Sequence, residues 1–238
     1  MWLAIDTASD RASVALGTGP ADAVGEEVVG ARRHAAALLP MVERLLARRR
    51  ATLDDVTALA LADGPGSFTG LRVGAAMAKA LARSRRLPLW VAPSLMVRAA
   101  GVAREGGLVL AVADALRGEV YAGLYRFLPG RVETLLPARV RRPEELASGA
   151  PVPDLLVGEA PGPVVRGLEA WAGRPMIGPP AGAPQARVLI GLTALDGGAA
   201  RVEALDGWQP EYGRPAEAQT RWEAVHGRPL PDPVGDPR

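Results

Sequence analysis

Residues 63–74 of the chain read DGPGSFTGLRVG. The apolar run 58–62 comes before this stretch, and the alanine-rich segment 75–83 follows it. Glycine permits tight backbone turns, and Ser67 and Thr69 are residue types that cap helix N-termini. The stretch therefore predicts a tight turn from a strand into a helix in an α/β protein. Backbone N–H groups at such a helix start can face an anion.

The glycine spacing excludes two common phosphate-binding motifs. A Walker A loop needs a lysine directly after its last glycine, whereas the only lysine of the chain, Lys79, lies nine residues beyond Gly70. A dinucleotide-binding turn reads G-x-G-x-x-G, but Gly64, Gly66 and Gly70 are spaced G-x-G-x-x-x-G. The turn alone therefore predicts a general anion site and no particular nucleotide.

Length and composition limit the class of protein. The 238 residues are enough for one large domain or two small ones, and 48% of them are hydrophobic while 4% are aromatic. No apolar run reaches the roughly eighteen residues of a membrane span, and residues 1–6 read as a strand without the basic start of a signal peptide. The chain has no cysteine, which excludes disulfides and thiolate metal sites. We expect a cytoplasmic protein that does not bind membranes.

Charge is unevenly distributed along the chain. The formal net charge is +2, with 14 basic and 9 acidic residues in 1–104 and 14 basic and 17 acidic residues in 105–238. Arginine supplies every basic residue except Lys79. One interpretation is a GC-rich genome that favours arginine codons. The other is that the N-terminal half meets an acidic partner or an RNA backbone.

A strand–aspartate–turn–strand unit occurs twice. Apolar residues flank the turn 6–10 (DTASD) on both sides, and they flank the turn 114–118 (DALRG), about 108 residues later, in the same way. A repeat at this distance predicts two related halves. We expect an N-terminal half (1–104), a shorter C-terminal half (105–222) and a Pro-rich tail (223–238).

Two helices are expected between the repeated units. Residues 34–50 carry leucines at helical spacing, and Pro40 should kink this helix or mark its first turn. Residues 70–85 combine small residues with Met77 and Leu81, which favours close packing. Further expected elements are a capped turn at 52–55, a strand at 155–158, helices at 163–171 and 185–200, and a Pro/Gly loop at 175–184.

Three segments resemble the TsaB (YeaZ) family, whose members are partners of the enzyme that makes N6-threonylcarbamoyladenosine in tRNA. Residues 64–74 (GPGSFTGLRVG) resemble the family's G-P-G-S-F-T-G-L-R-x-G turn, and 114–121 (DALRGEVY) its D-A-R-x-G-E-V-Y element. Residues 208–214 (WQPEYGR) with Glu217 resemble its P-x-Y-x-R…E segment. The resemblance implies an α/β, actin-like (ASKHA, ribonuclease H-like) duplicated fold of two subdomains, with the second one shortened.

The TsaD-type enzymes, catalytic relatives of this family, carry a similar G-P-G turn followed by an H-x-x-x-H metal pair. On that pattern the two histidine positions fall on Ser94 and Arg98. Neither residue replaces an imidazole at a transition metal, because arginine has no free lone pair and serine is a weak ligand. A second departure is Leu116, with Arg117 beside it, where the family commonly has arginine. The resemblance therefore implies a related fold with no catalytic residue and no metal.

By this resemblance, the chain is a non-catalytic scaffold and dimerisation subunit. It would activate a TsaD-type catalytic partner that, together with a TsaE-type ATPase, transfers threonylcarbamoyl to adenosine 37 of tRNA. It would form a homodimer when alone and reach tRNA through the complex. The subunit alone is expected to bind no cofactor, whereas the complex would hold ATP and Mg²⁺.

Carboxylates and hydroxyls gather at the predicted turns. If both hairpin tips face one cleft, Asp6 and Asp114 could hold hydrated Mg²⁺ near phosphates; the alternative is that each aspartate caps its own turn. The rival function is therefore a stand-alone ATP-dependent phosphotransferase of the actin/sugar-kinase superfold, with Asp6 as base, and a metal-free homodimeric hydrolase ranks last. The residues expected to face nucleotide or phosphate are Asp6, Thr7, Gly64, Gly66, Ser67, Gly70 and Asp114.

The two histidines, His34 and His226, are too far apart in sequence to predict a metal site or a Ser-His-Asp set. His34 matches the family pattern before an L-L-P element, and we interpret it as structural or as part of an interface. The two N-terminal helices are expected to form the partner surface, with Leu39 and Leu46 facing outward. The expected interface residues are His34, Leu38, Leu39, Val42, Leu45, Leu46, Met77 and Leu81.

Overall fold

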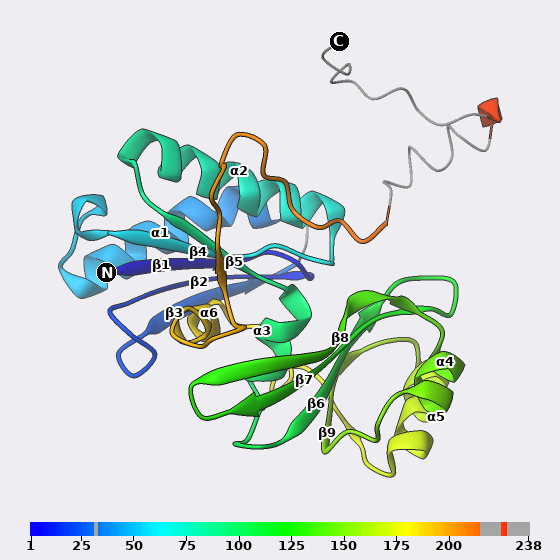
Figure 1. Ribbon diagram of the computed structural model, residues 1–238. Coiled ribbons are helices and arrows are strands. Elements are labelled where there is room, and N and C mark those ends of the chain that lie inside the picture. Colours follow the sequence, from blue (N-terminus) through cyan, green and yellow to red (C-terminus); the bar gives the residue numbers. More distant parts are fainter. Residues whose placement is uncertain (31–32, 215–224, 228–238) are drawn as a thin grey trace.

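The computed structural model describes residues 1–30, 33–214 and 225–227, and it contains two β-sheets with helices packed on their faces (Figure 1). The strands of the first sheet are β1 (Trp2–Asp6), β2 (Arg11–Gly17), β3 (Val24–Val29), β4 (Ala58–Ala62), β5 (Leu89–Ala92) and β11 (Ala200–Arg201). Their order is β11-β5-β4-β1-β2-β3. Strands β1, β4 and β5 run parallel, whereas β2, β3 and β11 are antiparallel to the strands beside them.

Helices cover both faces of the first sheet. α1 (His34–Arg49) and α2 (Phe68–Arg85) pack on one face, and α3 (Ser94–Ala100) and α6 (Ala186–Leu192) pack on the other (Figure 1). Successive side chains of a strand point to opposite faces of the sheet. Every residue of the central strand β4 is therefore buried, as expected for a strand with both faces covered.

The second sheet is smaller and has one helix-covered outer face. Its strands are β6 (Leu108–Asp114), β7 (Val120–Leu128), β8 (Arg131–Arg141), β9 (Leu155–Glu159) and β10 (Met176–Ile177), in the order β10-β9-β6-β7-β8. α4 (Pro143–Gly149) and α5 (Gly162–Ala172) cover the outer face. α3 packs against the inner face, so its side chains belong to a core shared by both sheets.

Both halves contain the repeated unit that the sequence predicts. β1 and β2 form an antiparallel hairpin, and β1 pairs with β4 in parallel. In the same way, β6 and β7 form an antiparallel hairpin, and β6 pairs with β9 in parallel. This repeated topology confirms the α/β, actin-like duplicated fold. Among the described residues, the second sheet has five strands and the first has six.

The structure confirms most of the expected elements and corrects others. The turn at 52–55 is a 3-10 helix, η2 (Leu53–Asp55), capped by the side chain of Thr52. The helix expected at 185–200 is α6, which is shorter and ends at Leu192. The chain then turns, with Gly197 at a φ of 69°, and residue 200 joins β11. Two residues of the expected loop 175–184 form β10. Pro40 lies inside α1 and not in its first turn.

The last described elements return to the first sheet. α6 packs on β1, β2 and β4, and β11 pairs with β5, although both come after residue 105. The expected boundary between residues 104 and 105 remains a prediction. Glu217 and the expected tail 223–238, apart from 225–227, lie outside the described residues. Within the described ranges, no helix is both long enough and apolar enough to cross a membrane.

Candidate functional site

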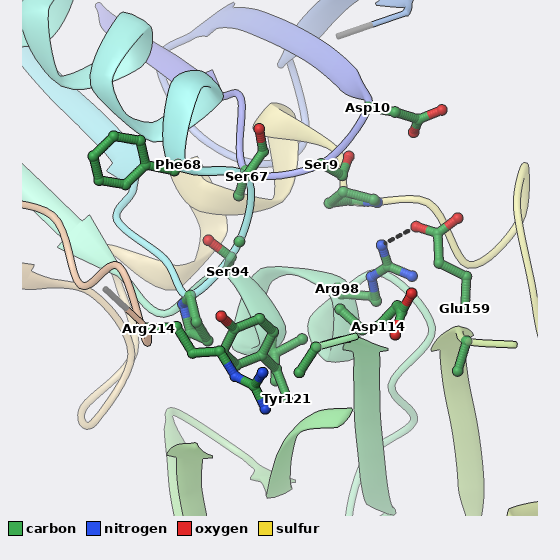
Figure 2. A pocket seen from close by; sticks show the side chains of 18 of the residues that line it. Ser9, Asp10, Ser67, Phe68, Ser94, Arg98, Asp114, Tyr121, Glu159 and Arg214 are labelled. Atoms are coloured by element: carbon green, nitrogen blue, oxygen red, sulfur yellow. Dashed lines mark hydrogen bonds and ion pairs between the residues drawn. The ribbon is translucent and has the colours of Figure 1, made fainter. Parts of the chain in front are cut away.

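A cleft of about 630 Å³ lies between the two halves. Its walls come from the β1–β2 turn, the glycine turn before α2, α3, the β6–β7 turn, the end of β9 and the segment at residues 212–214. Figure 2 shows Ser67, Arg98 and Asp114 around it. Of the seven residues expected to face nucleotide or phosphate, Gly66, Ser67 and Asp114 line the cleft and the other four do not.

Close packing against neighbouring backbone explains the glycines of the turn. A Cβ atom on Gly66 would lie 2.1 Å from the carbonyl oxygen of Ala8, and one on Gly70 would lie 2.0 Å from that of Thr7. Both distances are far shorter than an ordinary van der Waals contact. Only glycine therefore lets this turn lie directly against the β1–β2 turn, and this packing brings the N-terminus of α2 to the cleft.

Gly66→Ala is expected to lower the free energy of unfolding by about 2–3 kcal/mol, because the β1–β2 turn must shift to accept the methyl group. Urea denaturation measures this loss. The matched control is Gly167→Ala in α5, where a Cβ atom would meet nothing within 4 Å. The free energy of unfolding of the control should rise by about 0.5–1 kcal/mol, because alanine favours the helix over glycine. Equal stabilities of the wild type and Gly66→Ala would contradict this account of the turn.

Hydrogen bonds within the protein use some of the N–H groups of the turn. The N–H of Gly64 donates to Oγ of Ser94 at 2.9 Å, and the N–H of Ser94 donates to the carbonyl of Gly64 at 2.7 Å. The N–H of Ser67 donates to the carbonyl of Ala8 at 2.7 Å. Ser67 is also the N-cap of α2, since its Oγ accepts from the N–H of Gly70 at 3.2 Å. The turn is thus held by α3 and the β1–β2 turn, and its anion-binding role stays a prediction.

The two repeated aspartates cap their own turns. Oδ1 of Asp6 accepts the N–H of Ala8 at 3.0 Å, and Oδ1 of Asp114 accepts the N–H of Leu116 at 2.8 Å. These are the same Asx-type bonds in the two halves. Asp114 lines the cleft, whereas Asp6 is 1% exposed and lies beneath it. Only one of the two carboxylates can therefore meet a ligand directly.

Burial dominates the chemistry of Asp6. Removal from water raises the pKa of its carboxyl to about 6, although the hydrogen bond from Ala8 and the charges of Arg98 and His34 act in the opposite direction. Within the described residues, Oδ2 of Asp6 has no hydrogen-bond partner. A phosphotransferase base must reach its substrate, so the place of Asp6 beneath the cleft speaks against its expected role as base.

The two positions aligned with the metal pair form internal contacts. Ser94 begins α3 and accepts the bond from Gly64 described above. Arg98, on the same helix, is 3% exposed, and its Nη2 donates to Oε1 of Glu159 at 2.7 Å (Figure 2). This ion pair joins α3 to the end of β9 in the second sheet. Arg98 therefore places a fixed positive charge at the cleft beside two carboxylates, those of Asp6 and Glu159.

The expected interface residues divide into a buried and an accessible group. Leu46, expected to face outward, is 8% exposed and belongs to the core beneath α1, so that expectation is wrong. Leu39 is 52% exposed, as expected. Met77 and Leu81 are half-buried against the same core. The remaining expected interface residues are buried, namely His34, Leu38, Val42 and Leu45.

His34 is held inside the protein. Its side chain is buried, and Nε2 lies 3.1 Å from the carbonyl oxygen of Asp10 in the β1–β2 turn. His34 thus connects the start of α1 to a turn that lines the cleft. The contact fits the structural interpretation of this histidine.

Sequence reasoning missed two groups at the cleft. Arg214 forms an ion pair with Glu119, although the two residues are far apart in the chain. The rings of Phe68 and Tyr212 are tilted against each other at 4.8 Å, and the guanidinium of Arg72 lies 4.2 Å from the Phe68 ring. The signal for Glu119 and Arg214 was their place in two of the segments that carry the family resemblance, but nothing in the sequence pairs them.

A family model described as TsaD, tRNA N6-adenosine threonylcarbamoyltransferase, matches residues 28–163, more than half of the chain. The chain belongs to this family. The matched region spans α1, the glycine turn, α3 and the strands β6 to β9 of the second half, including Asp114 at the end of β6. It therefore includes most of the cleft.

Within the TsaD family, the chain groups with the TsaB (YeaZ) proteins. It is 43% identical over 127 residues to the tRNA threonylcarbamoyladenosine biosynthesis protein TsaB of Escherichia coli, covering 52% of this chain and 54% of the relative. It is 35% identical over 136 residues to the protein of the same name from Bacillus subtilis, covering 57% and 59%. In these alignments the chain spans little more than half the length of the curated relatives it matches.

Solved structures of the TsaB (YeaZ) group extend the similarity to most of the chain. YeaZ from Pseudomonas aeruginosa superposes with a TM-score of 0.65 at 29% identity, covering 79% of this chain and 87% of that one. A second structure, described as an uncharacterised protein with similarity to peptidase YEAZ from Pseudomonas aeruginosa, gives a TM-score of 0.70 at 28% identity, covering 90% and 99%. The resemblance that the glycine turn indicates is confirmed.

Proposed function

We propose that the chain is a non-catalytic scaffold subunit of the machinery that transfers threonylcarbamoyl to adenosine 37 of tRNA, and that it activates a TsaD-type catalytic partner. Family membership and the names of the relatives support the pathway. The observation that carries the scaffold role is an apolar, accessible surface on α1 and α2, in a chain whose cleft residues Ser94 and Arg98 are engaged in internal contacts.

The proposed partner surface, which we call the α1–α2 surface, is mainly apolar, with the exposed charged residues Glu43 and Arg72 within one helical turn of it. It comprises the exposed residues Ala36, Leu39, Pro40, Ala76 and Ala80 and the half-buried residues Val73 and Met77. On helical spacing, these residues lie on the sides of the two helices that face away from the sheet. Interface cores are typically apolar and poor in charge. The alanines allow a partner helix to approach closely, and Leu39 is the largest apolar side chain that the surface offers to water.

Partners follow from this assignment. A TsaD-type subunit would occupy the α1–α2 surface, and in its absence a second copy of the chain would occupy the same surface as a homodimer. A TsaE-type ATPase would join the complex, which would hold ATP and Mg²⁺ and receive tRNA. The absence of cysteine from the sequence fits a reducing compartment, and we place the complex in the cytoplasm.

Co-purification tests the scaffold role. A tagged copy of the chain, produced in its own cell, should retain the TsaD-type protein through washing, and the complex should run as one species in size-exclusion chromatography. Retention must persist after nuclease treatment, because the proposed contact is between proteins. Failure to retain the TsaD-type protein would contradict the proposal.

The cleft supports a second candidate, the ATP-dependent phosphotransferase. The volume of the cleft, about 630 Å³, is in the range of small-molecule sites. We expect no micromolar ATP binding by the isolated chain in calorimetry with Mg²⁺ present, because Asp6 lies beneath the cleft and two N–H groups of the glycine turn are engaged within the protein. Micromolar ATP binding that is lost in Asp6→Asn would favour the phosphotransferase over the scaffold.

A further inference from the structure

Residues 202–214, which we call the clasp segment, connect the far edge of the first sheet to the cleft. The segment follows β11, runs along α2 and reaches the glycine turn without forming a helix or strand (Figure 1). Irregular segments are usually the most mobile and least constrained parts of a domain. This one instead has specific contacts along its whole length.

The first half of the clasp segment is fixed to α2 and β5. The N–H of Val202 donates to the carbonyl of Leu89 at 2.8 Å. Asp206 forms an ion pair with Arg83, and Lys79 donates to the carbonyl of Trp208 while its ammonium lies 5.4 Å from the centre of the indole. Two of the polar side chains on this flank of α2 therefore hold the segment.

The middle of the clasp segment lies on the glycine turn. The N–H of Glu211 donates to the carbonyl of Asp63 at 2.7 Å, and Tyr212 packs against Phe68. A Cβ atom on Gly64 would lie 2.0 Å from the carbonyl oxygen of Glu211. With its φ of 114°, Gly64 therefore needs to be glycine for the segment to approach this closely.

The end of the clasp segment crosses to the second sheet. Arg214 forms an ion pair with Glu119, which directly precedes β7. Gly213 has a φ of 71°, and a Cβ atom there would lie 2.5 Å from the ring of Tyr121. Both side chains of the ion pair are about 30% exposed, 28% for Arg214 and 30% for Glu119. Such a half-buried pair is less screened by salt than a fully exposed one.

The two halves are also joined at the opposite end of β7. The N–H of Asp196 donates to the carbonyl of Gly130 at 3.0 Å, and the N–H of Val132 donates to the carbonyl of Asp196 at 2.7 Å. These bonds connect the chain after α6 to the β7–β8 turn. Besides the core that both sheets share through α3 and the Arg98–Glu159 ion pair, the halves thus meet at both ends of one strand, through backbone bonds near Gly130 and through a side-chain ion pair at Glu119.

We propose that the clasp segment holds the cleft closed, with the Arg214–Glu119 ion pair as its fastening point and the backbone contacts at Gly130 as the hinge. Loss of the ion pair leaves the hinge intact, so the two halves stay joined but open at the hairpin tips. The inference concerns this chain alone and holds whether or not the scaffold proposal is correct.

Distance measurement between spin labels tests the clasp. Because the chain has no cysteine, Ser9→Cys and Leu116→Cys place one label on each of the two hairpin tips that line the cleft. In this labelled background we expect Arg214→Gln and Glu119→Gln each to shift the distance distribution to longer values by more than its original width. The double variant should match the single ones, because the two changes remove the same contact.

Arg142→Gln is the matched control. Arg142 also approaches Glu119, with Nε 3.9 Å from Oε1, but it lies between β8 and α4 as the N-cap of α4 and so within the second half. Its removal should leave the distance distribution unchanged. An unchanged distribution in Arg214→Gln, or an equal shift in Arg142→Gln, would overturn the proposal. Circular dichroism of each variant verifies that the sheets are intact.

Discussion

Leu39→Glu is expected to convert the homodimer that we propose for the isolated chain into a monomer. Leu39 is 52% exposed on the α1–α2 surface. A carboxylate introduced into an apolar interface has no partner there, and its desolvation costs several kcal/mol. Central interface residues usually contribute ~2 kcal/mol or more each. We therefore expect the dimer dissociation constant to rise by about 30-fold or more, measured by analytical ultracentrifugation.

The control for this variant is Val152→Glu. Val152 is 54% exposed, which nearly matches Leu39, but it lies in the loop before β9 on the second half. The Val152→Glu variant should leave dimerisation and folding unchanged. A dimer that persists in a well-folded Leu39→Glu protein would place the interface elsewhere. Leu46→Glu is not an equivalent test, because Leu46 is part of the core and its replacement should unfold the domain.

The stability of the chain is expected to fall as the pH rises from about 4 to 8, because of Asp63. Burial raises the pKa of its carboxyl from 3.8 to about 7, and the charge of Glu211 adds to this effect, although a backbone hydrogen bond opposes it. The folded state therefore binds the proton more tightly than the unfolded state. Across this window the difference amounts to about 4 kcal/mol of unfolding free energy.

Asp63→Asn isolates this contribution. Urea denaturation at several pH values should show the unfolding free energy of the variant rising relative to that of the wild type as the pH rises. Most of this relative change should be complete by about pH 7 to 8. Glu211 and Tyr125 are the titratable groups that face Asp63. For Asp6→Asn, the unfolding free energy should also rise relative to the wild type. This relative change should be mostly complete near pH 6, because burial raises the pKa of Asp6 to about 6. A constant difference between Asp63→Asn and the wild type across the range would contradict the assignment.

The sequence predicts the parts of the fold whose pattern is local. The strand–aspartate–turn–strand units are visible because mainly apolar stretches of four to seven residues flank a recognisable turn. The same Asx bond forms at Asp6 and at Asp114. The helices at 34–49 and 68–85 are visible because their apolar residues recur at helical spacing. Local periodicity and turn chemistry were sufficient there.

Three of the elements that the sequence did not predict have a clear physical reason. α3 has only seven residues, and most of them are buried, so it shows no amphipathic pattern. β3 (VGEEVV) is an edge strand with exposed glutamates, which makes it resemble a loop. β8 contains Pro137, and proline normally argues against a strand. It is tolerated because β8 is the edge of its sheet and the pairing with β7 is irregular near this point.

The candidate site was predicted only in part because tertiary contacts decide it. The sequence places glycines at 64, 66 and 70 beside a possible anion, but the structure shows that each is required by the approach of another backbone segment. Asp6 and Asp114 look equivalent in sequence, whereas the shared core buries one of them and leaves the other at the cleft. Spacing along the chain cannot distinguish a residue that lines a cleft from one that lies beneath it.

Reconstituted threonylcarbamoyl transfer tests the scaffold account most directly. The purified chain, the TsaD-type and TsaE-type proteins of the same cell, ATP, threonylcarbamoyl adenylate and unmodified tRNA are combined, and modified adenosine is measured by mass spectrometry after omission of each protein in turn. The account predicts no modification by the chain alone, and a loss of modification when the chain is omitted or replaced by Leu39→Glu. Modification by the chain alone, or undiminished modification in its absence, would contradict the account.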